Sequence, residues 1–394
     1  RAIKLKPDID FILGALLHAR MYLSLWDGFE HLLSTLVKKI NDDEKASTPF
    51  IVVSLIDDPE IHRKSTEIFV KEKYPPSDIL PKINPYLKHN KIKIGYFSAD
   101  FKNHPVAVLT AQLYEMHDRD KFEIYAFSFS PDTNDEMNIR IKAGVDHFYN
   151  VHKMTSKDIA ELTRSIEIDI AIDLGGHTQG SRTGVFTMRA APIQISYIGY
   201  LGTMGASYFD YLVADQTLVP KENQKYFSEK IAYLPCWQVN DSKKKLPTNV
   251  VTRQEFGLPD KGFVFCCFNN TYKITPDAFD SWTRILKRVD GSSLLLYVDN
   301  DVAQDNLRKE IALRGLDENR IVFGKRLPMQ EYLARYQVCD LFLDTFAYSA
   351  GTTASDALCM KTPLLTYMGK SFASRAAASL LNAIDMPEMI TKSQ

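Results

Sequence analysis

The sequence has few cysteines, and their spacing is not that of a metal or disulfide framework. The five are Cys236, Cys266, Cys267, Cys339 and Cys359. None forms a CxxC pair or stands near a histidine cluster, which argues against a zinc site and against structural disulfides. Reduced thiols and a cytoplasmic location are therefore expected.

The sequence also lacks an excess of either charge and any long apolar run. It has 48 Lys and Arg against 49 Asp and Glu, for a formal net charge of -1. No long-range field is available to hold a polyanion, and the short basic run 243–245 is typical of a solvated linker. No apolar run approaches the ~18 residues that a membrane-spanning helix needs. Neither nucleic acid nor a membrane is an expected partner.

The chain has 394 residues, 45% of them hydrophobic, which is enough for two or three domains. Residues 1–85 carry helical periodicity and predict an all-helical segment. A polar stretch at 239–250 predicts an inter-domain linker. The chain begins without Met and stops at Gln394 soon after a helical pattern, so we expect a fragment that is truncated at its C-terminus.

From residue 91 onward, short β-rich runs alternate with helix-length amphipathic stretches. This alternation is typical of βαβ units and parallel sheets, and it predicts an α/β protein with two doubly wound lobes, 86–238 and 251–394. Ligands of such sheets bind beyond the carboxyl ends of the strands, so a nucleotide-linked substrate is expected in a cleft between the lobes. The expected strands are 91–97, 122–127, 168–174, 193–198, 211–214, 263–268, 294–298, 320–323, 341–343 and 364–366.

Residues 341–358 form the most informative segment, because they predict a buried strand, a loop of small residues and the start of a helix. The exposed N–H groups of a helix start bind anions. Thr352 and Thr353 fall in the first turn and Asp356 follows on the same face, about 5–6 Å along the axis. This spacing suits a diphosphate and its adjacent ribose. The same residues also cap helices and complement the helix dipole without any ligand.

Polar side chains follow two strands of the first lobe. Pro105 at a first helical position places His104 at the helix cap, facing the cleft. A neutral imidazole there could relay protons or bind a phosphate oxygen, or it could simply cap the helix. Gly175, Gly176 and His177 follow the strand predicted at 168–174. Glycines there permit close approach of a ligand or form tight turns. The spacing is not GxGxxG, so no dinucleotide fingerprint is present.

In the second lobe, Asn270 and Lys273 follow the first strand. A lysine ammonium aimed at a leaving diphosphate would stabilise the negative charge that develops there, although many such lysines are only solvated. Residues 299–301 (Asp-Asn-Asp) resemble the acidic triplet with which metal-dependent glycosyltransferases hold their ion. Such residues are also common in loop turns, and no metal is expected.

Five short segments, 98–105, 189–194, 199–206, 268–274 and 351–356, occur in order through both lobes. Together they resemble the protein O-linked N-acetylglucosamine transferases and their SPINDLY-type relatives, over roughly residues 90–390 and in a bacterial-type version. Residues 1–85 look like the helical segment that follows the tetratricopeptide repeats of these enzymes. The resemblance implies a glycosyltransferase-B fold, a nucleotide-sugar donor, inversion at the anomeric carbon without a metal or other cofactor, and Ser or Thr hydroxyls of polypeptides as acceptors.

The resemblance also implies roles for individual residues. His104 falls on a histidine that organises donor and acceptor, and Lys273 on a lysine that neutralises the leaving diphosphate. Glu161 falls near an acidic position of the family, and the general base is left unassigned. The residues that fall at or near the nucleotide-sugar site are Asn270, Arg335, Tyr332, Gly351, Thr352, Thr353, Asp356, His177, Gly202 and Thr203.

Four departures from the family pattern bear on the donor. Gly351 and Tyr332 stand where the animal enzymes have histidines, Met329 replaces a lysine, and Leu201 replaces a usual proline. The leading hypothesis is transfer from UDP-N-acetylglucosamine to proteins, and GDP-fucose is the second candidate donor. A nucleotide-sugar epimerase, which would need acid and base carboxylates, and a binding scaffold without turnover also stay open. The oligomeric state is open.

Overall fold

The computed structural model describes residues 9–84 and 86–393, so the predictions made for residues 1–8, 85 and 394 lie outside it. Contacts within the chain divide it into two compact units. One comprises residues 62–244, and the other joins residues up to 61 with those from 245 onward. The boundary after residue 244 falls inside the linker predicted at 239–250.

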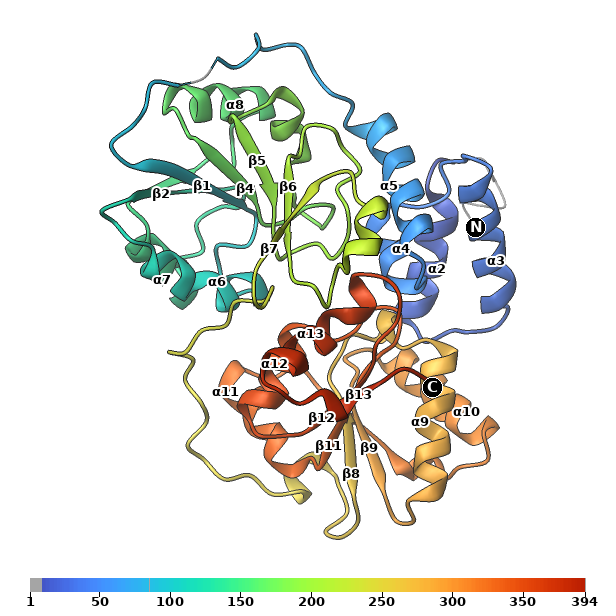
Figure 1. Cartoon of the computed structure of the whole chain (residues 1–394). Coiled ribbons are helices and arrows are strands. Elements are labelled where there is room, and N and C mark those ends of the chain that lie inside the picture. Colours follow the sequence, from blue (N-terminus) through green and yellow to red (C-terminus); the bar gives the residue numbers. More distant parts are fainter. Residues whose placement is uncertain (1–8, 85, 394) are drawn as a thin grey trace. The chain divides into compact units, whose positions relative to one another are not determined.

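The unit 62–244 contains a seven-stranded parallel sheet with the order β3-β2-β1-β4-β5-β6-β7. Helices α6 (Pro105–Met116) and α7 (Glu136–Gly144) lie on one side of this sheet and α8 (Ser156–Ser165) on the other (Figure 1). The order reverses between β1 and β4, as in doubly wound folds. The strands are β1 (Ile92–Ser98), β2 (Phe122–Ser128), β3 (His147–Asn150), β4 (Ile170–Asp173), β5 (Ile193–Ser196), β6 (Tyr211–Ala214) and β7 (Lys230–Tyr233), and the 3-10 helices are η1 (Thr183–Met188) and η2 (Lys221–Tyr226).

Local sequence explains these elements. The carboxyl halves of β1 and β2 are fully buried, and the Phe97 and Phe127 rings stack with centroids 4.4 Å apart. Helix α8 begins with a capping box, in which the Thr155 hydroxyl and the Asp158 carboxylate each accept a hydrogen bond from the other residue's backbone N–H. Apolar runs therefore fill the sheet, and polar caps fix where the helices start.

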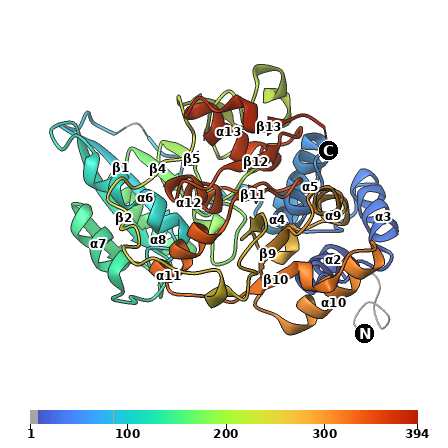
Figure 2. The ribbon, with the colours of Figure 1, turned by 90° about the horizontal axis from the view of Figure 1, so that it is seen from below.

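The other unit contains a six-stranded parallel sheet with the order β10-β9-β8-β11-β12-β13. Figure 2 shows β12, β11, β9 and β10 in this order. The strands are β8 (Val264–Cys267), β9 (Ser293–Tyr297), β10 (Ile321–Gly324), β11 (Leu341–Leu343), β12 (Leu364–Tyr367) and β13 (Ile390–Thr391). The helices are α9 (Pro276–Arg288), α10 (Asp301–Leu313), α11 (Met329–Ala334), α12 (Thr352–Cys359) and α13 (Ala376–Ala383), with 3-10 helices η3 (Gln254–Phe256), η4 (Thr271–Lys273), η5 (Glu318–Arg320), η6 (Arg335–Val338), η7 (Ala373–Arg375) and η8 (Pro387–Met389).

The N-terminal helices α2 (Ile12–Tyr22), α3 (Phe29–Asn41) and α4 (Pro49–Leu55) belong to this second unit. The Thr271 hydroxyl donates to the Tyr22 carbonyl at 2.9 Å, and the Trp26 ring lies 5.3 Å from that of Phe279. Helix α5 (Pro59–Lys73) begins in this unit and continues in the other. The helical segment predicted at 1–85 is thus shared between the two units.

The predicted fold class is confirmed. Both lobes are parallel α/β sheets, and each predicted strand overlaps an observed one. Three observed strands, β3, β7 and β13, were not predicted. Within residues 9–84 and 86–393, no helix combines the length and the apolar character that crossing a bilayer requires.

Candidate functional site

The predicted strand, loop and helix are present in the second unit as β11, residues 344–351 and α12. Asp344 holds the loop closed, because one of its carboxylate oxygens accepts from the backbone N–H groups of Thr345 and Ala350, both at 2.8 Å. The other oxygen accepts from the Thr366 hydroxyl at 2.7 Å. Burial raises the pKa of Asp344 to about 6. The loop that leads into α12 is therefore built around one buried carboxylate.

Asn269, at the end of β8, joins this loop to the first turn of α12. Its side-chain amide group donates to Asp344 at 3.1 Å and to the Thr345 hydroxyl at 2.8 Å, and its carbonyl oxygen accepts from the Thr353 hydroxyl at 2.6 Å. Only 2% of Asn269 is exposed. The Thr353 hydroxyl, predicted to bind diphosphate, thus hydrogen bonds within the protein. Its neighbour Asn270, the predicted nucleotide contact, is exposed.

Lys273 lies beside the same loop. Its ammonium group stands 3.8 Å from the centroid of the Tyr348 ring, which is a cation–π distance. Desolvation lowers the pKa of Lys273 to about 8, while the charge of Asp344 acts in the opposite direction. The ammonium group therefore lies against the loop that leads into α12, at a residue three positions before the cap residue Gly351.

A cluster of aromatic rings supports the segment that carries Lys273. The Tyr272 ring lies 5.0 Å from His18 and from Tyr22, both on α2, and 5.9 Å from Phe50 on α4. The Phe50 ring also lies 6.1 Å from that of Tyr348. The N-terminal helices therefore pack against Tyr272, the neighbour of Lys273, and against Tyr348, whose ring lies 3.8 Å from the lysine ammonium group.

Arg335 is fully buried, with 0% exposure. Its guanidinium lies 4.1 Å from the Phe268 ring and 5.3 Å from the Tyr332 ring, and it donates to the Lys325 carbonyl at 3.3 Å. Burial lowers the pKa of Arg335. Among the described residues its Nε has no hydrogen-bond partner. A buried donor without a partner is costly, so this N–H suits an acceptor atom of a ligand.

Tyr332 connects Arg335 to Asp356. Its hydroxyl lies 3.0 Å from that of Tyr336 and interacts with the Asp356 carboxylate, which is 3% exposed. Burial and the Asp356 charge raise the pKa of Tyr332. The Tyr336 hydroxyl in turn donates to the Thr353 carbonyl at 3.1 Å. Four of the predicted nucleotide residues of the second lobe, Arg335, Tyr332, Asp356 and Thr353, are thus linked around the first turns of α12, whereas Asn270 is exposed.

In the first lobe, His104 is the N-cap residue of α6, as the sequence predicted. Its Nδ1 accepts from the Val106 backbone N–H at 3.3 Å and lies 3.6 Å from the Asp100 carboxylate. Burial lowers the pKa of His104, while Asp100 acts in the opposite direction. With Nδ1 accepting, a neutral ring carries its proton on Nε2.

His177 lies after β4, between aromatic rings. Its Nε2 donates to the Met204 carbonyl at 3.0 Å, and the rings of Phe69 and Tyr200 lie 5.5 and 5.2 Å away. Its buried Nδ1 has no hydrogen-bond partner in the described part of the chain. Burial lowers the pKa of His177 to about 4, so the ring is neutral at physiological pH.

The other predicted residues of the first lobe have visible structural contacts. The buried Thr203 hydroxyl donates to Glu229 at 2.6 Å, and Gly202 precedes it in the same loop. Glu161 is exposed on α8 and forms an ion pair with Lys157 at 3.1 Å. The predicted residues therefore fall into two groups, one in each unit, and their roles in binding stay predictions.

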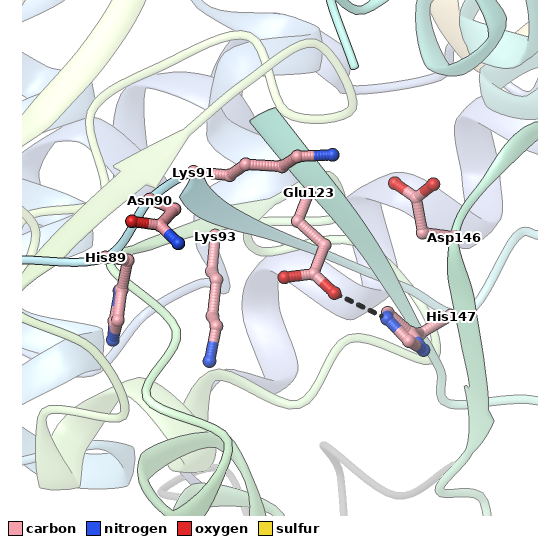
Figure 3. A pocket seen from close by; sticks show the side chains of 7 residues that line it. All are labelled: His89, Asn90, Lys91, Lys93, Glu123, Asp146 and His147. Atoms are coloured by element: carbon pink, nitrogen blue, oxygen red, sulfur yellow. Dashed lines mark hydrogen bonds and ion pairs between the residues drawn. The ribbon is translucent and has the colours of Figure 1, made fainter. Parts of the chain in front are cut away.

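Two surface hollows in the first lobe are lined by none of these predicted residues. The larger, about 480 Å³, is lined by residues that begin β1, β2 and β3, at the amino edge of the sheet (Figure 3). Its charged groups are largely paired, as with His147 and Glu123 at 2.8 Å and His89 and Asp169 at 2.9 Å. A second hollow of about 360 Å³ lies at the amino ends of β5, β6 and β7. His104 and His177 instead follow the carboxyl ends of β1 and β4, where ligands of parallel sheets bind.

No metal centre is visible in the described structure. Across residues 9–84 and 86–393, no group of three or more His, Cys, Asp or Glu side chains is arranged to hold an ion. All five cysteines are free thiols. The requirement for a metal stays untested, and the prediction of a metal-independent reaction stays a prediction.

Known proteins resemble the chain in both sequence and structure. It is 37% identical to a probable UDP-N-acetylglucosamine–peptide N-acetylglucosaminyltransferase, SEC, of Arabidopsis thaliana over 296 residues, which cover 74% of this chain and 30% of that protein. It is 27% identical to the UDP-N-acetylglucosamine–peptide N-acetylglucosaminyltransferase of Caenorhabditis elegans, and the match covers 77% of this chain and 36% of that protein. The solved structure of a mutant of Thermobaculum terrenum O-GlcNAc transferase superposes with a TM-score of 0.81 at 25% sequence identity. The superposition covers 100% of this chain and 75% of that chain.

The chain spans about a third of the length of these curated relatives. The superposition with the solved transferase extends over the whole chain, so the two parallel lobes and the helices before them follow one known architecture, the glycosyltransferase-B fold. The model of glycosyl transferase family 41 matches residues 60–249 and 240–394. Because these matches cover most of the sequence, the chain belongs to glycosyl transferase family 41.

Proposed function

We propose that this chain transfers N-acetylglucosamine from UDP-N-acetylglucosamine to Ser and Thr hydroxyls of polypeptides, with inversion and without a metal. Family membership and the names of the relatives support the donor and the acceptor. The observation that carries the proposal is the partly buried ammonium group of Lys273, held at 3.8 Å from the ring of Tyr348 in the loop that leads into α12. The free thiols are also in keeping with a cytoplasmic protein.

The reaction requires charge stabilisation more than covalent chemistry from the protein. The acceptor oxygen forms a bond to the anomeric carbon while the bond between that carbon and the diphosphate oxygen breaks. The electron pair of the broken bond stays on the departing UDP. The hydroxyl proton passes to a base in the site. In this proposal, Lys273 and the N–H groups of the first turn of α12 bind the diphosphate, where the negative charge grows. Preorganised charges of this kind need no reorganisation during the reaction.

The second lobe also suits the nucleotide. We assign the nucleobase to the neighbourhood of Arg335, whose Nε lacks a partner among the described residues, and the ribose to Asp356. The guanidinium group lies 4.1 Å from the centroid of the Phe268 ring and 5.3 Å from that of the Tyr332 ring. A carbonyl oxygen of the nucleobase could accept a hydrogen bond from the Nε–H of Arg335. Tyr332 and Met329, which depart from the family pattern, are near this proposed nucleobase position. Direct measurements of nucleotide binding therefore have to distinguish uracil from guanine.

Thermal denaturation in the presence of nucleotides tests the donor. UDP and UDP-N-acetylglucosamine are expected to raise the melting temperature, because a ligand at 100 times its Kd stabilises the native state by about 2.7 kcal/mol. GDP and GDP-fucose are expected to have little effect at the same concentrations. A larger shift with the guanine nucleotides would overturn the donor assignment, and no shift with any nucleotide would overturn the transferase proposal.

His104 can be tested with two variants that separate capping from chemistry. His104→Asn keeps a good N-cap and removes the imidazole, so we expect near-wild-type stability and about 10²-fold slower transfer. His104→Ala removes both and is expected to lose about 1 kcal/mol of stability in addition. Transfer rates and urea unfolding of both variants supply the measurements. Wild-type transfer by His104→Asn would reduce His104 to a helix cap.

A further inference from the structure

Glu229 is a buried carboxylate that no sequence pattern singled out. It directly precedes the edge strand β7 and is 5% exposed. Its two oxygens accept from the Thr203 hydroxyl at 2.6 Å, the Ser228 hydroxyl at 3.1 Å and the Met204 backbone N–H. All three partners are hydrogen-bond donors, so the carboxylate ties together residues 203, 204 and 228. A buried carboxylate of this kind is expensive unless its contacts are complete.

These contacts fix the loop between β5 and β6. The Thr203 oxygen, held by Glu229, accepts from the backbone N–H groups of Gly205 and Ser228 at 3.1 and 3.2 Å. The Ser228 hydroxyl oxygen accepts from the Ala206 N–H at 3.1 Å. Gly205 has φ +62°, and a Cβ there would meet Thr66 of α5 at 2.8 Å. The loop is therefore held on one side by the carboxylate network and on the other by a helix.

The same loop determines how His177 carries its proton. Met204 links Glu229 to His177. Its backbone N–H donates to Glu229, and its carbonyl oxygen accepts from His177 Nε2 at 3.0 Å. A carbonyl only accepts, so the neutral ring must carry its proton on Nε2 and leave a lone pair on Nδ1. This Nδ1 is buried and has no partner among the described residues. It can accept a hydrogen bond from a hydroxyl or amide N–H of a ligand, but it cannot donate one.

We propose that Glu229 is a positioning residue for the transfer site: through Met204 it fixes the tautomer of His177, so that Nδ1 accepts a hydrogen bond from a hydroxyl or acetamido N–H of the bound sugar. The inference rests on the proposed function for the identity of the ligand, but the link from Glu229 to His177 stands on contacts within one unit. Displacement of a substrate group by about 1 Å can cost about 10²-fold in rate.

The test compares Glu229→Met, which keeps volume and removes both oxygens, with Glu229→Gln, which keeps one oxygen for the Met204 N–H. Long-range proton–nitrogen correlation spectra of the full chain report the His177 tautomer, and the spectrum of His177→Gln assigns the signal. Glu229→Met is expected to lose the single Nε2–H form and to slow transfer by about 10- to 100-fold. Glu229→Gln is expected to keep the tautomer and most of the activity. Glu222→Met, an exposed change in the same unit, is the matched control.

If Glu229→Met does not fold, Glu229→Asp replaces it, because the shorter side chain keeps the charge but loses reach toward Met204. An unchanged His177 signal in the folded variant overturns the proposal, whatever the transfer rate. Because the spectra need no turnover, they separate this inference from the proposed function. A changed tautomer in a protein that transfers no sugar would support the positioning link and refute only the transferase assignment.

Discussion

Lys273→Met is expected to lower kcat for sugar transfer by about 10²- to 10³-fold, the usual cost of removing one group that stabilises charge in the transition state. Methionine has a similar length and no charge, so the Tyr348 ring and the aromatic cluster under residue 272 keep their packing. The melting temperature should therefore not fall. Lys309→Met, a change at an exposed lysine on α10, is the control and should transfer at the wild-type rate.

The pKa of Lys273 gives this prediction a pH signature. Because that pKa is about 8, kcat/KM for the donor should fall as the pH rises through 8, when the ammonium loses its proton. Stability should change in the opposite direction. Between pH 8 and 10.5 the unfolded chain binds more protons at this lysine than the folded chain does, so its contribution to stability rises with pH. Both trends should vanish in Lys273→Met, and a wild-type kcat in that variant would refute the leaving-group role.

Asp344→Ala is expected to destabilise the protein by about 3–5 kcal/mol, because it leaves several buried donors without an acceptor. These donors are the N–H groups of Thr345 and Ala350, the Thr366 hydroxyl and the Asn269 amide. The loop before α12 would lose its central contact, and nucleotide binding should weaken with it. Urea unfolding measures the loss.

Asp344→Asn is the matched control for this variant. Its carbonyl oxygen can still accept from the two backbone N–H groups, and the Thr366 hydroxyl can rotate to accept from its amide, so the expected loss is only about 1 kcal/mol. The pKa of Asp344 is raised from 3.8 to about 6, so its contribution to stability is present at low pH and is lost as the pH rises through 6. The asparagine variant should lack this component. Equal stability losses for both variants would contradict the role given to the carboxylate.

The interior strands were predictable from sequence because burial on both faces leaves short continuous apolar runs, such as Val264–Cys267 in β8. The three strands that sequence missed are all at the edges of their sheets. β3 reads His-Phe-Tyr-Asn and none of its residues is fully buried, and β13 has only two residues. Edge strands need less apolar character, so their local signal is weak.

The site was predictable only where one segment carries it. Strand ends, glycine loops and the cap position of His104 follow from local patterns, and α12 begins at Thr352 as expected. Glu229 has no such signal, and for Asn269 only the position at a strand end was predictable, since each acts on residues distant in sequence: Asn269 on Asp344 and Thr353, and Glu229 on the loop at Thr203. The packing of α2 in the unit that contains residues 245–394 likewise depends on contacts between residues distant in sequence, such as Tyr22 with Tyr272.

The most direct test of the central claim is the affinity of the wild type and of Lys273→Met for UDP and for UMP, measured by calorimetry. If Lys273 and the start of α12 bind the diphosphate, the wild type should prefer UDP to UMP by about 10- to 100-fold, the equivalent of one or two charge-assisted hydrogen bonds. Lys273→Met should lose most of this preference and keep its affinity for UMP. An identical preference in both proteins would show that the diphosphate is bound elsewhere.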